Sequence, residues 1–390
     1  MLAPLILWPL ATILGLQLVF VDSLNGAVTD DFTTVYAALQ RFVHGENIYE
    51  QVYHHTDPLY LYNPGATLIL SPLGLINDAG LARALFIFAN AAGIVASLAI
   101  LTRMFGYSLR SAVLPFSIVI ATMTEAVRNT LIFSNINGLL LLALVGYLWC
   151  LTKNYRWARW AAGLIIGFAI VIKPQFAPLL FLPLIMRWWS TIAIGIAVPV
   201  VLNVIAWPIA PGAGNYRAEL VPHLRQTRDF ANSSLPGLAE YFAMPEWLYY
   251  PLWLLFAALA GIAVLALLAV RTHDHLLWLV TTSGVLFCGV FFLSSLGQMY
   301  YSMLLFPMIF SFTRQYSVFH IWPSWLAAVL FLSPLNWTMA WTSTATLPIG
   351  TWMNFFSATL GWGLLLLTTA VCSVAWLRQH VRHADVEYRT

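Results

Sequence analysis

The stretch Thr29–Pro72, TDDFTTVYAALQRFVHGENIYEQVYHHTDPLYLYNPGATLILSP, lies between apolar segments and holds much of the polar chemistry of this chain. In it an Asp pair precedes an amphipathic run, a glycine turn and a cluster of tyrosines and prolines. From Phe32 to Phe42 the apolar residues recur at helical spacing, which predicts a helix lying on a membrane surface and ending at Gly45. We therefore expect residues 22–81 to form a loop on one face of a membrane protein.

Composition indicates the class of protein. The 390 residues are 61% hydrophobic and 8% charged, whereas a soluble domain carries roughly a quarter charged residues. Hydropathy and length predict an all-α polytopic protein with about twelve transmembrane helices, in one transmembrane domain over residues 1–390. Pro4–Val21 is expected to be a retained first helix, since no Lys or Arg precedes it. Residues 65–76 are too short to span and predict a re-entrant or interfacial helix.

The distribution of positive charge predicts the orientation. When the 22–81 loop is placed outside, most Lys and Arg residues fall on the inner side, as the positive-inside rule requires. The same topology puts residues 210–246 outside and the tail 378–390 in the cytoplasm. We thus expect a multi-pass protein of the plasma membrane whose polar loops cluster on the outer face.

Charge and cysteine content argue against other classes. The formal net charge is +3 and the basic residues are dispersed, which argues against nucleic acid as a partner. Cys150, Cys288 and Cys372 lie in apolar runs without CxxC spacing, so neither a disulfide framework nor a metal site is predicted.

Two interpretations are open for the Asp pair that begins the predicted surface helix. Asp30 and Asp31 stand in the first turn, where carboxylates commonly cap a helix or favour its dipole. A carboxylate in an outer loop is equally suited to act as a general base.

Cations near the outer face are similarly ambiguous. Lys173 ends the apolar run IIGFAIVIKPQ, where a lysine is costly unless it reaches the interface or pairs with an anion. Four arginines are expected on the same side: Arg128, Arg217, Arg225 and Arg228. They form a pocket for a lipid phosphate, or they are unrelated snorkelling side chains.

Several motifs occur in the same order along this chain as in a known protein family. The first loop carries Asp31, Phe32, Val35, Tyr36 and Ala38, followed by Gly45, Tyr49, Tyr62, Pro64, Leu70 and Pro72. Later motifs are Lys173-Pro174, Leu182-Pro183-Leu184, Arg187-Trp188-Trp189, and Asn232-Ser233-Ser234-Leu235 with Gly237. In these features the chain resembles glycosyltransferase family 87, which has the GT-C fold and uses polyprenyl-phosphate sugars. The resemblance runs over most of the chain.

The resemblance implies roles for individual residues. Asp31 corresponds to the catalytic base of the family, with Asp30 as the alternative. Together with the charge placement above, the resemblance gives the predicted substrate-binding residues: Asp30, Asp57, Tyr62, Arg128, Asn135, Asn137, Lys173, Arg225, Arg228, Asn232, Gln298, Tyr300 and Tyr301. Two motifs depart from the family pattern: Ser134–Asn137 stands where many members have GQxN, and Ser294–Tyr301 lacks the His of an SWxH motif.

A closer resemblance concerns the family members that transfer arabinofuranose. It is carried by Thr29–Tyr36, Asp57–Pro64, Asn135–Gly138, Thr227–Ser234 and Gln298–Pro307. It implies an inverting α-(1→3)-arabinofuranosyltransferase that takes its sugar from decaprenyl-phosphate arabinofuranose and branches cell-wall arabinan or a related glycolipid at the periplasmic face, with no cofactor. The alternatives are a mannosyltransferase using polyprenyl-phosphate mannose, and a lipid or sugar transporter or flippase. Against transport, the chain shows no internal repeat and its polar segments gather on one face.

Overall fold

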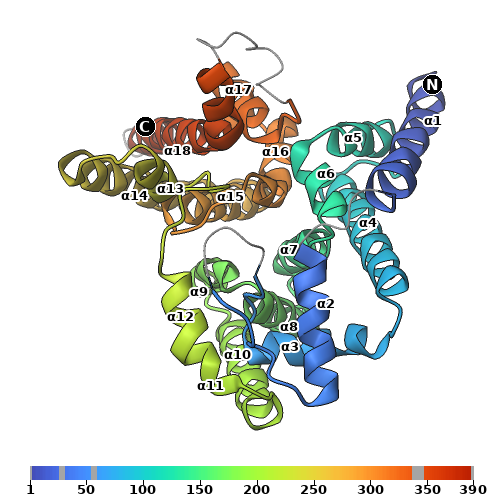
Figure 1. Cartoon of the computed structure of the whole chain (residues 1–390). Helices are drawn as coiled ribbons and strands as arrows, with labels where there is room; N and C mark the ends of the chain where they lie inside the picture. The colour runs from blue at the N-terminus through green and yellow to red at the C-terminus, as the bar shows by residue number, and fades with distance from the viewer. Residues whose placement is uncertain (1, 26–30, 54–58, 336–346, 388–390) are drawn as a thin grey trace. The chain divides into compact units, whose positions relative to one another are not determined.

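The computed structural model describes residues 2–25, 31–53, 59–335 and 347–387 of the chain (Figure 1). These residues form helices and loops, with no β-strand among them. Over the described part, the predicted all-α class is therefore confirmed.

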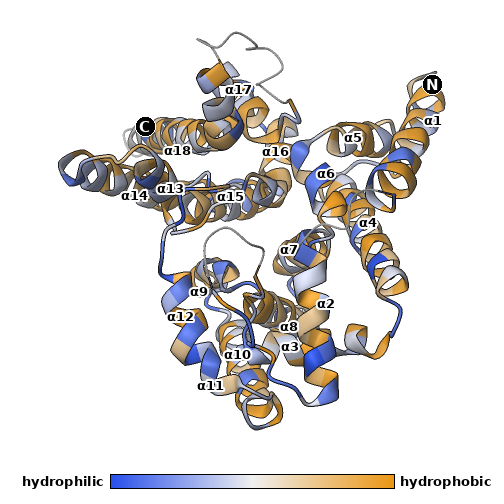
Figure 2. Ribbon diagram, viewed as in Figure 1, coloured by the Kyte–Doolittle hydropathy of each residue, from blue (hydrophilic) through white to orange (hydrophobic). Residues whose placement is uncertain are grey.

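Six described helices are long and apolar enough to cross a membrane, and Figure 2 shows how apolar residues dominate the helical surfaces. They are Ala3–Ser23, Ala79–Met104, Trp189–Ile209, Glu246–Thr272, His275–Leu293 and Leu347–Gln379. A multi-pass membrane protein is thus supported. The count of about twelve spans stays a prediction, because the remaining apolar helices of the described part are shorter, among them Pro64–Leu75 and Asn137–Leu151.

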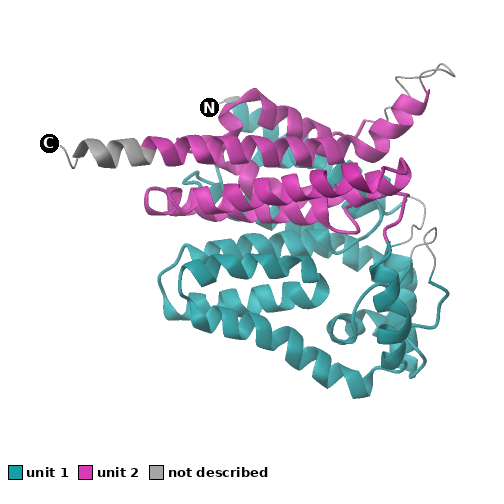
Figure 3. Ribbon diagram, turned by 90° about the vertical axis from the view of Figure 1, so that its left-hand side faces the viewer, with its two compact units in different colours: residues 1–226 teal, residues 227–390 magenta. Residues whose placement is uncertain are grey.

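The chain divides into two compact units (Figure 3), of which unit 1 comprises residues 1–226. Its helices are α1 (Leu2–Leu16), α2 (Asp31–His44), α3 (Pro64–Leu70), α4 (Ala79–Met104), α5 (Val113–Thr122), α6 (Glu125–Ile132), α7 (Asn137–Leu151), α8 (Arg156–Ile172), α9 (Phe181–Ile185), α10 (Trp189–Ile209), α11 (Ala213–Asn215) and α12 (Val221–Leu224). Helix α8 packs between α7 and α10, and α7 also packs on α4. Helix α3 lies against α10.

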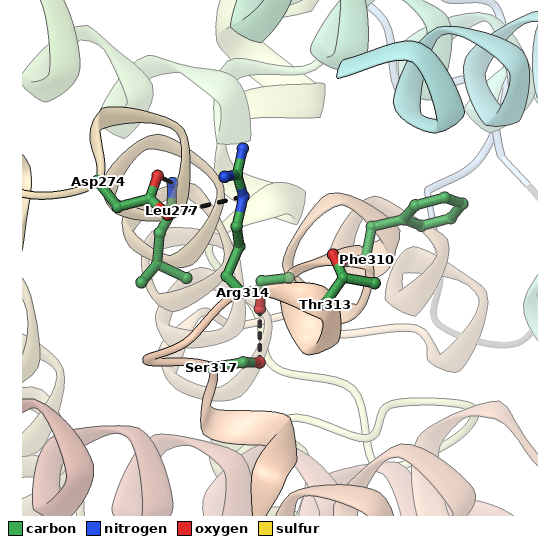
Figure 4. A network of polar contacts seen from close by, with 7 residues as sticks. Asp274, Leu277, Phe310, Thr313, Arg314 and Ser317 are labelled. Atoms are coloured by element: carbon green, nitrogen blue, oxygen red, sulfur yellow. Dashed lines mark hydrogen bonds and ion pairs between the residues drawn. The ribbon is translucent and has the colours of Figure 1, made fainter. Parts of the chain in front are cut away.

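Unit 2 comprises residues 227–390. Its helices are α13 (Leu235–Tyr241), α14 (Glu246–Leu267), α15 (His275–Leu293), α16 (Phe306–Ile309), α17 (Trp322–Leu332) and α18 (Leu347–Glu387). Helix α18 packs on α14, α15 and α17. At the start of α15, Asp274 accepts a hydrogen bond from the Leu277 amide at 2.9 Å and pairs with Arg314 at 3.6 Å (Figure 4). One carboxylate thus caps this helix and neutralises a cation.

Helix α2 forms where the hydrophobic periodicity predicts it. It ends at His44, and Gly45 follows with φ +77°, a left-handed conformation that glycine adopts without strain. The Tyr36 hydroxyl donates to the Ile76 carbonyl at 2.5 Å, and Gln40 Nε2 donates to the Gly74 carbonyl at 2.9 Å. These bonds attach α2 to the chain that follows α3, so the predicted helix is confirmed and fixed in place. Thr29, which precedes the Asp pair and which the sequence makes a plausible N-cap of this helix, lies outside the described residues.

Helices α4 and α7 lie in close contact at Gly138. A Cβ atom built on Gly138 would lie 2.6 Å from the Asn90 carbonyl oxygen and 2.9 Å from the Asn90 Cβ. Further along α7, Gly146 has its nearest neighbour at 3.8 Å, which is ordinary van der Waals contact. The first glycine is therefore required by packing, whereas the second is not.

We predict that Gly138→Ala lowers the thermal unfolding temperature of the purified protein in detergent, because overpacking a close helix contact costs about 1–3 kcal/mol. Gly146→Ala is the matched control in the same helix, and it should leave the unfolding temperature unchanged or raise it slightly, since Ala is the better helix former. Equal unfolding temperatures for the two variants would contradict the close contact.

Candidate active site

Lys173 brings together the beginnings of two helices that are far apart in sequence. It directly follows α8, and its Nζ donates a hydrogen bond to Asn137 Oδ1 at 2.6 Å. Its charge also interacts with that of Asp31, the first residue of α2. Asp31, Asn137 and Lys173, three residues predicted to be functional, therefore lie in one polar region of unit 1.

The loop between α6 and α7 supplies two carboxamides to this region. Asn135 is 9% exposed and Asn137 is fully buried. Asn135 Oδ1 accepts from the Asn137 amide at 3.1 Å, while the Nδ2 groups of both residues hydrogen-bond to none of the described residues. A buried unsatisfied donor costs about 1–3 kcal/mol. Two buried donors therefore lie in this loop, and one of them belongs to the side chain that accepts from Lys173 Nζ.

Helix α4 holds this loop at both ends. Arg83 Nη2 donates to the Ile132 carbonyl at 3.0 Å, and Asn90 Oδ1 accepts from the Leu139 amide at 3.1 Å. Arg83 and Asn90 are seven residues apart, so they lie two turns apart on the same face of α4. The loop carrying Asn135 is thereby held in one conformation.

A further anchor attaches α3 to the neighbours of Lys173. Asn63 caps α3 by accepting from the Ala66 amide at 3.0 Å, and its Nδ2 donates to the Val171 carbonyl at 2.7 Å. The Gly65 amide donates to Asn203 Oδ1 of α10 at 3.0 Å. The loop that contains α2 and α3 is thus bonded to the helices beside the site.

These anchors were missed by the sequence analysis. Arg83, Asn90 and Asn203 belong to no quoted motif. Asn63 lies in the quoted stretch Asp57–Pro64 but was given no role there. Each of the four bonds to a residue distant in sequence. These residues could have been found in the sequence as polar side chains in or beside apolar helices. Unsatisfied hydrogen-bonding groups are costly there, so such side chains are expected to bond to other parts of the protein.

The tyrosines of the first loop form a small core. Tyr49 and Tyr60 are fully buried, and burial raises the pKa of both phenols above the usual range, so they stay neutral. The Tyr60 hydroxyl shares a hydrogen bond with Thr67 Oγ1 at 2.6 Å, and the Tyr49 hydroxyl donates to the Tyr62 carbonyl at 3.0 Å. Tyr62 is half-buried at the edge of this core, and its predicted contact with substrate stays a prediction.

Helix α6 contains an ion pair and a buried acid. Arg128, a predicted substrate residue, pairs with Asp22 at 3.0 Å. At the start of the helix, Glu125 Oε1 accepts from Asn129 Nδ2 at 2.6 Å, and burial raises the pKa of Glu125 to about 7. The Asp22 pairing already gives Arg128 an anionic partner within the protein.

The remaining predicted residues are placed as follows. Arg225 is exposed near the end of unit 1, and Arg228 is half-buried in unit 2. In unit 2 the Tyr300 hydroxyl donates to Gln298 Oε1, and the Tyr300 and Tyr301 rings meet edge to face with centroids 5.1 Å apart. Asp30 and Asp57 lie outside the described residues. The described part contains no group of three or more His, Cys, Asp or Glu residues placed to hold a metal ion.

Comparison with known proteins places the chain in a family. A family model described as glycosyltransferase family 87 matches residues 60–295. The chain is 54% identical over 376 residues to the α-(1→3)-arabinofuranosyltransferase of Corynebacterium glutamicum, covering 96% of this chain and 88% of that protein. Enzymes with the same name from Mycolicibacterium smegmatis and Mycobacterium tuberculosis are 38% and 39% identical, each over 93% of this chain and 83% of the relative. These matches confirm the predicted family and the class of enzyme: the chain belongs to glycosyltransferase family 87.

Proposed function

We propose that this glycosyltransferase moves arabinofuranose in α-(1→3) linkage from decaprenyl-phosphate arabinofuranose to cell-wall arabinan or a related glycolipid, creating 3,5-branch points. The sugar and the linkage are supported by relatives of that name, which are 38–54% identical over nearly the whole chain. The same similarity argues against the mannosyltransferase and the transporter.

The observation that carries the mechanism is the meeting of Asp31, Asn137 and Lys173. The acceptor hydroxyl oxygen forms a bond to the anomeric carbon, and Asp31 takes the hydroxyl proton as general base. The bond from the anomeric carbon to the phosphate oxygen breaks, and the lipid phosphate leaves with the electron pair. The Lys173 ammonium and the Nδ2 groups of Asn135 and Asn137 stabilise the charge on that phosphate.

One carboxylate is sufficient for this reaction. A β-linked donor and an α-linked product require inversion, which proceeds by direct attack without a covalent intermediate. A retaining glycosidase mechanism would need a second carboxylate as nucleophile, about 5–5.5 Å from the first. The inverting reaction therefore needs no second carboxylate beside Asp31.

The position of Asp31 suits a base. It begins α2, where the helix dipole favours the ionised carboxylate. The next residue, Phe32, is 3% exposed and packs on Phe86 of α4 with ring centroids 5.6 Å apart. Because successive helical side chains point about 100° apart, burial of Phe32 against α4 leaves Asp31 pointing in a different direction from the Phe32 ring. The packing of Phe32 therefore fixes the direction of the base.

We place the site on the periplasmic face. This orientation puts residues 22–81 and 210–246 outside and the tail 378–390 in the cytoplasm, and it rests on the excess of Lys and Arg in the inner loops. A phosphate carried by a polyprenyl chain lies at the membrane interface, so a cation beside the surface helix α2 is suitably located to bind it.

The proposed function is tested by transfer in vitro. Purified protein is given decaprenyl-phosphate arabinose or decaprenyl-phosphate mannose, with an α-(1→5)-linked arabinan oligomer as acceptor, and the product linkages are determined. We expect arabinose alone to be transferred, producing 3,5-linked residues. Transfer of mannose, or a product without 3-linkages, would overturn the proposal; transfer of neither sugar together with substrate flux in liposomes would favour a transporter.

We predict that Asp31→Asn lowers turnover by a factor on the order of 10² to 10⁴, the usual effect of a lost general base, while the protein remains folded and binds donor. Asp30→Asn should retain measurable activity. The matched control is Asp78→Asn, because Asp78 caps α4 by accepting from the Leu81 amide at 3.0 Å and Asn caps equally well. A greater loss in Asp30→Asn than in Asp31→Asn would show that the base is misassigned.

Donor binding gives a separate prediction. Lys173→Met and Asn137→Leu should each lower kcat/KM for the lipid donor roughly 10- to 100-fold, because a hydrogen bond to a charged group contributes about 1.5–3 kcal/mol. Lys153→Met is the control: Lys153 lies over the Trp149 ring at 5.1 Å, at the other end of α7 and about 22 Å along the helix from Asn137. An unchanged kcat/KM for the donor in both site variants would exclude a phosphate site here.

A further inference from the structure

Asn232 of unit 2 has its whole hydrogen-bonding capacity occupied by backbone groups. Its Nδ2 donates to the carbonyls of Arg228 at 3.0 Å and Ser295 at 2.8 Å. Its Oδ1 accepts from the amides of Ser234 at 3.2 Å and Gly297 at 2.9 Å. A carboxamide offers two N–H donors and two acceptor lone pairs, so none remains for a sugar or a phosphate. The side chain is also 2% exposed.

The surrounding chain is built closely around this carboxamide. A Cβ atom on Gly237, in the first turns of α13, would lie 2.4 Å from Asn232 Cγ, so a side chain there is excluded. The Ser234 hydroxyl accepts from the Gly237 amide at 3.0 Å and caps the same helix. The spacing of Asn, Ser and Gly in the motif is thus explained by packing and capping.

Ser233 bonds the same segment to two other parts of unit 2. Its amide donates to the Gly297 carbonyl at 2.6 Å, and its hydroxyl donates to the Phe355 carbonyl at 2.7 Å. The Thr359 hydroxyl of α18 donates to the Ser233 carbonyl at 2.6 Å. Both backbone polar groups of Gly297 are therefore held, the amide by Asn232 and the carbonyl by Ser233.

We infer that Asn232 is a positioning residue that acts through Gln298 and does not contact the substrate. Gln298 directly follows Gly297, and its Oε1 accepts from the Tyr300 hydroxyl. An amide and a phenol in one hydrogen-bonded pair are suited to sugar hydroxyls. Because the amide and the carbonyl of Gly297 are both hydrogen-bonded, the backbone that carries Gln298 is fixed. The direction of the Gln298–Tyr300 pair is fixed with it. The inference rests on the proposed function in that Gln298 and Tyr300 contact the sugar substrate.

A double-mutant cycle on kcat/KM tests the inference. Asn232→Asp keeps the acceptors for Gly297 and Ser234 and loses the donors to Arg228 and Ser295. We expect Asn232→Asp and Gln298→Ala each to lower kcat/KM about tenfold, and the double variant to fall no further than Gln298→Ala, because a residue acting through another is coupled to it. A double variant that falls by the product of the single effects would overturn the inference.

Additional variants separate positioning from stability. Ser324→Ala removes a buried bond to the Val318 carbonyl, 2.7 Å long, in the same unit; it should lower the unfolding temperature while leaving kcat/KM unchanged. If Asn232→Asp does the same, its role is structural only and the inference is wrong. Should Asn232→Asp fail to fold, Asn232→Gln enters the cycle, since it keeps an uncharged amide and displaces it by one methylene.

The cycle also distinguishes this inference from the proposed function. It is measured with whichever sugar the wild-type enzyme transfers, so a wild-type enzyme that transfers mannose refutes the proposed function and leaves the coupling measurable. Conversely, a wild-type enzyme that transfers arabinofuranose while Gln298→Ala keeps its full kcat/KM refutes the inference alone.

Discussion

The polar region of unit 1 depends on the hydrogen bond from Lys173 Nζ to Asn137 Oδ1. A lysine at the end of an apolar helix is costly unless its charge is solvated or paired. The Asn137 oxygen and the Asp31 carboxylate offset part of that cost from within the protein. The Nδ2 of the same Asn137 side chain has no hydrogen-bond partner among the described residues. In the mechanism that we propose, the leaving phosphate supplies the acceptor for this donor.

Rigidity of this arrangement comes from the contact between α4 and α7. Gly138 allows the two backbones to meet, Asn90 bonds to the amide of Leu139, and Arg83 holds the carbonyl of Ile132. Ser134, between the two anchors, has φ +51°, a conformation that a non-glycine residue keeps when its surroundings enforce it. A preorganised donor set stabilises developing charge without the cost of reorienting during the reaction.

Local patterns in the sequence were sufficient for α2 and its end at Gly45, because hydrophobic periodicity and a left-handed glycine act over a few residues. Composition was sufficient to predict a membrane protein, and the order of the motifs was sufficient to predict the family. Charge placement grouped Lys173 with Arg225 and Arg228, and that grouping stays a prediction. It gave no sign of the hydrogen bond from Lys173 to Asn137. Asn63, Asn90 and Arg83 were missed because their bonds join residues 49 to 108 apart in the chain, a distance over which no local pattern operates.

Two asparagines of this chain look alike in the sequence, but their hydrogen bonds indicate different roles. Asn137 and Asn232 are both buried, and each stands in a short polar motif. Asn137 has a donor with no partner among the described residues, whereas Asn232 has every donor and acceptor engaged by backbone. Since buried polar groups are normally hydrogen-bonded, the fold accounts for Asn232, and we propose that a ligand completes Asn137. A buried asparagine in a polar motif can thus serve the geometry of the fold as well as chemistry.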